Sequence, residues 1–158
     1  MRRGRHSGIH KTRKQNGQAL VELASLLPLL SLILMGCLDL GRAFHVHMAA
    51  ANAAHVGLMY AQQVTDPADP TTSNHITVAD VITRTVNSAQ GSIPITLANA
   101  NGYVKVYVDS GSVPSSWDTT VGMSQTITVT VTDPSFKTIT PFVHLTTVGG
   151  SASGRTLP

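Results

Sequence analysis

The sequence predicts an α+β protein. A long N-terminal membrane-spanning helix precedes a small domain that contains one further helix and a short antiparallel sheet. Three observations predict this class. The run from Leu23 to Leu38 is apolar and carries no charge, and the stretch that follows it is rich in alanine and lacks proline. Beyond Gly91 the apolar residues recur every second position, which is the period of a strand rather than a helix.

The apolar run has almost the length needed to cross a bilayer. As a helix, Leu23 to Leu38 rises roughly 24 Å, whereas the hydrocarbon core of a bilayer is about 30 Å thick. Residues 18–40 reach that length and are predicted as the membrane part of a helix that covers residues 18–63. Pro28 removes one backbone hydrogen bond inside this helix, so a kink is expected there.

The second half of the predicted helix carries a stripe of larger residues. They recur at spacings of four, three, four and three, which is a helical period, and are Phe44, Met48, Ala51, His55 and Leu58. Alanines beside the stripe allow a close approach of another helix. Asp39 and Arg42 are three residues apart and are expected to pair where the helix leaves the membrane.

Residues 64–148 are predicted to form the small α+β domain. Its helix should run to Ala89, with Thr77 as its cap and Asp80 near its positive end. The predicted strands and turns lie at Ile95 to Ala98, Asn101–Gly102, Tyr103 to Val108, Thr126 to Thr132 and Phe142 to Val148. The Gly- and Ser-rich residues 149–158 are predicted to be a flexible tail.

Charge is distributed unevenly along the chain. Six of the eleven Lys and Arg residues lie before Gln15, so the chain from Gln18 onward carries a net charge of −3, against +3 for the whole. A nucleic-acid partner is therefore not expected. Because basic residues that flank an apolar helix stay in the cytoplasm, residues 1–17 are predicted to be a cytoplasmic leader and the C-terminal part to be extracytoplasmic.

Glu22 is out of place in this apolar helix. A carboxylate inside a membrane segment is costly, and neither a signal peptide nor a simple anchor has a use for it. Glu22 is the fifth residue after Gly17, and the basic leader ends at that glycine. No Lys, Arg or His lies within four residues of Glu22 on its own helix, so its partner is expected to come from elsewhere. An acid that reaches up to water at the headgroups is the alternative.

A basic leader, a glycine and an apolar helix with glutamate at its fifth position resemble the processing site of type IV prepilins. The opening NGQALVELASLLPLLSLILMGCLDLGRAF further resembles that of the TadE-like family of tight-adherence pilus systems. The matching positions are Gly17, Ala19, Val21, Glu22, Ala24, Pro28, Gly41 and Arg42. A weaker echo, VTVTDPSFKTITPF, resembles the strand and turn that these proteins carry near the C-terminus.

The resemblance implies a pseudopilin, either a minor pilin or an assembly factor, and not an enzyme. A prepilin-type membrane peptidase would cut between Gly17 and Gln18. The freed amine of Gln18, on the same or a neighbouring molecule, would then pair with Glu22 and register the helices. The implied partners are this peptidase, other pilin-like subunits, the pilus assembly machinery and the membrane.

Cys37 supports an alternative, namely a signal-anchored or lipid-anchored extracytoplasmic binding protein. It is the single cysteine and follows a basic region and an apolar run. The residues after it continue a helix rather than beginning a Ser- and Gly-rich tether, so this remains the second hypothesis.

No metal site or cofactor site is predicted, and an envelope enzyme is the least favoured of three hypotheses. The chain has seven histidines, but His45 and His47 are two apart and so lie on different faces of a helix. A helical metal pair needs a spacing of three or four. The glycine-rich stretch at residues 149–154 lacks the lysine and the following helix of a phosphate-binding loop.

Overall fold

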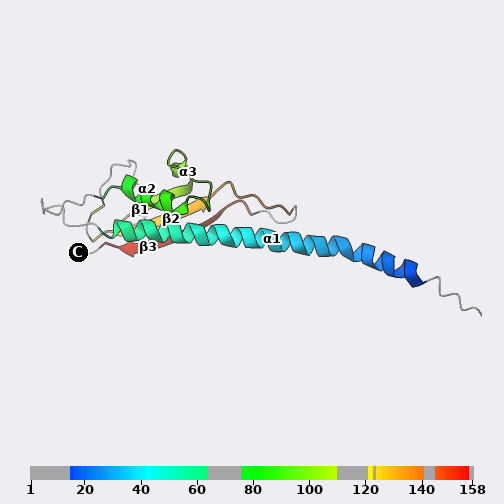
Figure 1. Cartoon of the computed structure of the whole chain (residues 1–158). Coiled ribbons are helices and arrows are strands. Elements are labelled where there is room, and N and C mark those ends of the chain that lie inside the picture. Colours follow the sequence, from blue (N-terminus) through cyan, green and yellow to red (C-terminus); the bar gives the residue numbers. More distant parts are fainter. Residues whose placement is uncertain (1–14, 64–75, 110–120, 123, 141–144, 157–158) are drawn as a thin grey trace, which may run out of the picture. The chain divides into compact units, whose positions relative to one another are not determined.

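The computed structural model describes residues 15–63, 76–109, 121–122, 124–140 and 145–156. The chain divides into two compact units, Met1–Leu38 and Asp39–Pro158. Helix α1 (Gln15–Ala61) contributes to both (Figure 1). Within the described residues, the further elements are two helices and a three-stranded antiparallel sheet. The predicted α+β class with a long apolar N-terminal helix is therefore confirmed.

In the first unit, α1 is apolar on every side. From Leu20 to Leu38 its large apolar side chains are 44–69% exposed. A helix that is apolar all round is stable when it lies inside a protein or a membrane. Among the described residues, α1 is the one helix that is long and apolar enough to cross a membrane, judged by length and composition. This agrees with a single membrane anchor.

In the second unit, α1 packs through its smallest residues. The buried positions on this half are mostly alanine: Ala43, Ala50, Ala53, Ala54 and Ala61. Phe44 and Met48 from the predicted stripe are instead 63% and 55% exposed, although Leu58 is buried. Close packing explains why the small residues rather than the large ones are buried, because even a Cβ at the buried Gly57 would collide with the Thr85 side chain of α2. Small residues bring the helix closer to the domain than the large stripe would allow.

Helix α2 (Val78–Ala89) begins at the cap that the sequence predicted. Asp80 N donates to Thr77 Oγ1 at 3.2 Å, and Thr77 N donates to Asp80 Oδ2 at 3.0 Å. The Thr77 hydroxyl and then its backbone N–H hold the pKa of the Asp80 carboxyl below its usual range. This stabilising contribution is present at neutral pH and is lost as the pH falls through the lowered pKa.

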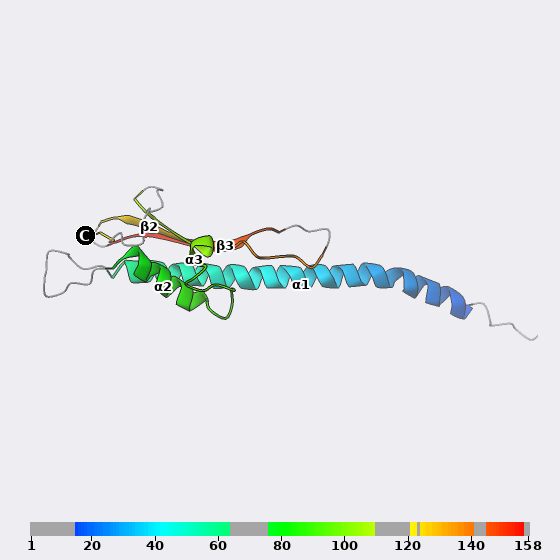
Figure 2. The ribbon, with the colours of Figure 1, turned by 90° about the horizontal axis from the view of Figure 1, so that it is seen from above.

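The sheet is built from β1 (Val104–Val108), β2 (Thr126–Asp133) and β3 (Val148–Arg155) in that order. Both pairings are antiparallel; Val106 lies opposite Val129, and Val129 lies opposite Ala152. The alternation predicted for the first two strands is confirmed. Valines and Ile127 on one face join the core with α1 and α2. The other face carries threonines on β2 and Lys105 and Tyr107 on β1. Figure 2 shows the strands running alongside the C-terminal half of α1.

The prediction of a flexible tail at residues 149–158 was wrong, since β3 occupies most of this range. Glycine and serine gave no apolar alternation, yet here they permit close packing on α1. A Cβ at Gly150 would lie only 2.5 Å from the Ala51 Cα. Two side chains also bond to the outer edge of the strand. His47 Nδ1 of α1 lies 2.6 Å from the Gly149 oxygen, and Gln62 Nε2, directly after α1, donates to the Arg155 oxygen at 3.1 Å.

Three smaller predictions also require correction. Ile95 to Ala98 is not a strand; Asn99 Oδ1 accepts from the Thr96 N–H at 2.7 Å and holds a turn there. Asn101 and Gly102 lie in the one-turn helix α3 (Ala100–Tyr103), which leads directly into β1 rather than closing a hairpin. The third strand begins at Val148, where the sequence predicted an edge strand to end. The predicted loop after the first helix and Phe142 fall outside the described residues.

Candidate processing and assembly site

Gly17 and Gln18 lie in the first turn of α1, because the helix begins at Gln15. Gly17 is exposed, and a Cβ built on it would meet nothing within 4 Å. The ends of helices fray, and the first four N–H groups of a helix have no partner within it. The peptide bond between Gly17 and Gln18 is therefore in the least constrained part of the helix.

Gln18 and Glu22 lie one turn apart on the same exposed face of α1. Gln18 Nε2 donates to Glu22 Oε1 at 3.3 Å. This contact was not predicted, because the neutral amide of Gln18 adds nothing to the charge pattern around Glu22. No ion pair to Glu22 occurs among the described residues, where the recorded pair is Arg42 with Asp39. Within the part of the chain that the structure describes, the carboxylate thus has a weak neutral partner and no ion pair.

Pro28 lies inside α1, and the helix is assigned continuously through it. Proline has no N–H to donate to the residue four positions earlier, so the carbonyl of Ala24 loses its helical partner. Ser31 Oγ donates to the Pro28 oxygen at 2.8 Å, one turn further along. The kink expected at Pro28 stays a prediction.

Cys37 is exposed on α1, and the helix continues from it to Ala61. A lipid attached to Cys37 as a new N-terminus would require a cut within this continuous helix. The three histidines of α1, namely His45, His47 and His55, are exposed, and His47 faces β3. Within the described ranges, no three His, Cys, Asp or Glu side chains gather as metal ligands would.

Asp39 is the first residue after the apolar run, and it makes a set of contacts that the sequence did not reveal. Its pairing with Arg42 is present, at 4.0 Å from Nη1 to Oδ1. Its closer partners are a hundred residues away: Ile139 N donates to Oδ1 at 2.9 Å, and Thr140 donates to Oδ2 from both N and Oγ1 at 2.7 Å. Asp39 itself is only 3% exposed. We call this arrangement the Asp39 clamp.

The segment that leads into the clamp is also packed on α1. The Arg42 guanidinium lies over the ring of Phe136, 5.6 Å from its centroid, and Phe136 is buried. Every residue except proline has a backbone N–H group, so the sequence does not indicate which amides bind a given carboxylate. The pairing of Asp39 with amides 100 positions away could therefore not be predicted from a sequence pattern. The DPSFKTITPF motif was the one signal that marked this segment.

We expect Asp39→Ala to release the segment around residues 136–140 without unfolding the sheet. The change leaves two backbone N–H groups and a hydroxyl without their acceptor, and bonds to a charged acceptor contribute about 1.5–3 kcal/mol each. Hydrogen–deuterium exchange should speed up at Ile139 and Thr140 by at least about tenfold. Asp80→Ala is the matched control, which should loosen only the first turn of α2. Unchanged exchange at Ile139 and Thr140 in Asp39→Ala would show that the clamp contributes nothing.

Comparisons with known proteins agree with the motif analysis. A protein family described as TadE-like protein matches residues 17–59. The matched region begins at Gly17 and includes Glu22, Pro28 and Arg42. No curated protein and no solved structure matches the chain. Residues 17–59 of this chain therefore form a TadE-like family domain.

Proposed function

We propose that the chain is a TadE-like pseudopilin, a minor pilin or assembly factor that a prepilin-type peptidase cuts between Gly17 and Gln18. A TadE-like domain implies a role in assembly of a tight-adherence pilus. The position of Glu22 is the observation that supports cleavage after Gly17 and the pseudopilin role. Glu22 is exposed and is the one charged residue of α1 between Gln15 and Leu38, and it lies five residues after the glycine at which the family match begins.

The proposed role of Glu22 follows from the products of cleavage. Hydrolysis of the peptide bond leaves a carboxylate on Gly17 and a free amine on Gln18. That amine is positively charged at neutral pH, with a reference pKa of about 7.7–8.0. The contact between Gln18 Nε2 and Glu22 Oε1 already puts the two residues on one face. A neighbouring helix staggered by about one turn would bring its own amine to this carboxylate.

The exposed surface of α1 beyond the apolar run supports packing against another helix. In the second unit, Phe44, Met48 and Met59 are more than half exposed on α1. Large apolar side chains exposed on a helix mark interaction surfaces when they gather. The proposed partners are other pilin-like subunits and the assembly machinery, and no catalytic role is proposed.

Removal of the gene should test the function as a whole. Cells that lack the chain should lose surface pili and attachment, and a plasmid copy of the wild-type gene should restore both. Pilus number is counted by electron microscopy, and adherence is measured on the same cultures. Normal pili in the absence of the chain would contradict a role in their assembly.

The proposed topology places residues 1–17 in the cytoplasm, residues 18–40 in the membrane and residues 44–158 outside. Its basis is the charge asymmetry on the two sides of the apolar run. Protease added to spheroplasts should digest the C-terminal domain and leave an N-terminal epitope protected. The opposite pattern, with the domain protected and the epitope lost, would show that the chain is inserted the other way round.

A further inference from the structure

The Asp39 clamp fixes a second segment of the chain at the end of the apolar run. We infer that the exposed side chains around the clamp rest on the phospholipid surface of the bilayer that α1 spans. We call these side chains the collar, and they are Leu40, Arg42, Lys137 and Ile139. The inference rests on the proposed membrane insertion of residues before Asp39. It adds a lipid contact made by the extracytoplasmic domain.

The height of the collar follows from the helix geometry. The 21 residues from Gln18 to Leu38 rise about 32 Å as a helix, which matches a hydrocarbon core of about 30 Å. Asp39 would therefore lie where the headgroups begin. Helical side chains lean toward the N-terminus, so the Asp39 carboxylate is displaced toward the membrane. It accepts the Ile139 N–H at 2.9 Å, which holds Ile139 at the same height.

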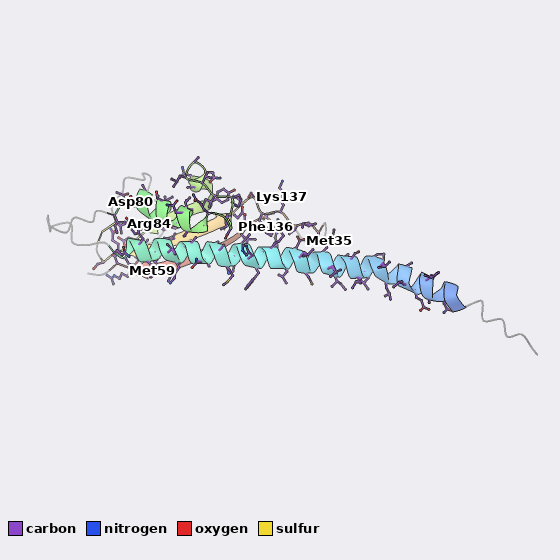
Figure 3. The ribbon with its side chains drawn as sticks, in the orientation of Figure 1. Met35, Met59, Asp80, Arg84, Phe136 and Lys137 are labelled. Atoms are coloured by element: carbon purple, nitrogen blue, oxygen red, sulfur yellow. The ribbon has the colours of Figure 1, made fainter. Side chains whose placement is uncertain are left out.

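The side chains of the collar have the chemistry of a membrane surface. Ile139 is 52% exposed and Leu40 is 70% exposed, so both present apolar surface at this level. Arg42 is an exposed cation. Lys137 is a second one, and Figure 3 labels it. The one acid of the described residues in this region, Asp39, is buried and occupied by its own hydrogen bonds. Apolar residues flanked by cations bind an interface whose phosphates are anionic.

Lipid is the occupant that the position favours. Leu38 directly precedes Asp39 in the chain and ends the charge-free run. If that run is in hydrocarbon, headgroups surround the helix at the next residue. The collar would also explain the clamp, because a buried carboxylate with three donors holds the lipid-facing segment rigidly against the helix.

Tryptophan quenching in vesicles tests the contact. The full-length chain with its single tryptophan changed, Trp117→Phe, is reconstituted into phosphatidylcholine–phosphatidylglycerol vesicles with brominated acyl chains. One tryptophan is then placed by Ile139→Trp, by Leu30→Trp within the apolar run, or by Tyr107→Trp on β1. Ile139→Trp should lose most of its emission to bromines near the headgroups, and Leu30→Trp should lose it to bromines deep in the chains. Tyr107→Trp should keep its emission with both lipids.

A charge reversal distinguishes lipid recognition from mere proximity. Adding Lys137→Glu to Ile139→Trp should reduce the quenching in vesicles rich in phosphatidylglycerol and should change it less in pure phosphatidylcholine. If Leu30→Trp is quenched but Ile139→Trp is not, the lipid contact is wrong while the membrane anchor stands. If neither is quenched, the membrane anchor is wrong and the collar fails with it.

Discussion

Glu22→Ala should be inserted and cleaved normally, yet fail to assemble with pilin-like partners. The change leaves the amine of a neighbouring Gln18 without a counter-charge in apolar surroundings. Removal of one member of a buried ion pair costs about 3–5 kcal/mol, which corresponds to at least about a hundredfold loss in an association equilibrium. Crosslinking between neighbouring helices and a count of surface pili measure the loss.

Glu22→Gln separates charge from shape. Glutamine retains the size of the side chain and can still accept the Gln18 amide, but it cannot neutralise an amine. It should therefore fail nearly as completely as alanine. Ser25→Ala is the matched control, since Ser25 lies one turn away on the same exposed stretch and its hydroxyl donates to the Glu22 backbone oxygen at 2.8 Å. Wild-type assembly of both Glu22 variants would show that the acid does not register the helices.

Gly17→Val should leave a full-length precursor. A peptidase must take the backbone before the cut into its active site in an extended form, and a residue without a Cβ places the fewest limits on that approach. The space around Gly17 is open, so valine should not disturb the fold. Co-expression with a prepilin-type peptidase and measurement of the product mass report the effect.

Gly36→Val is the control for this substitution. A Cβ at Gly36 also meets nothing within 4 Å, but the residue lies far along the apolar run. It should be cut at the wild-type rate. Equal processing of Gly17→Val and Gly36→Val would remove the basis for a cleavage site at Gly17.

The sequence predicted the elements whose stability depends on regular patterns. The apolar run, the Thr77 cap and the alternation of β1 and β2 each follow from local chemistry, and each is present. The prediction was wrong for β3, because Gly150 and Gly154 pack through the absence of side chains. A strand held by close backbone approach and by bonds from His47 and Gln62 has no apolar period to detect.

In the candidate site, too, the residues of a local motif were predicted and the contacts between distant residues were not. Gly17 and Glu22 were found because their spacing forms a local motif. The Asp39 clamp was missed because its donors are mainly the backbone of residues 139 and 140, brought near only by the path of the chain after β2. The pairing of Asp39 with Arg42 was predicted because the two residues are three positions apart on one helix. The contacts of Asp39 with Ile139 and Thr140 become apparent only in the folded chain.

We propose that the mature chain begins at Gln18, and its intact mass shows whether it does. For protein purified from cells that make the peptidase, we expect a chain shortened by the first 17 residues, with Gln18 at its N-terminus. A chain that retains the leader, or one that begins at a lipid-modified Cys37, would contradict it.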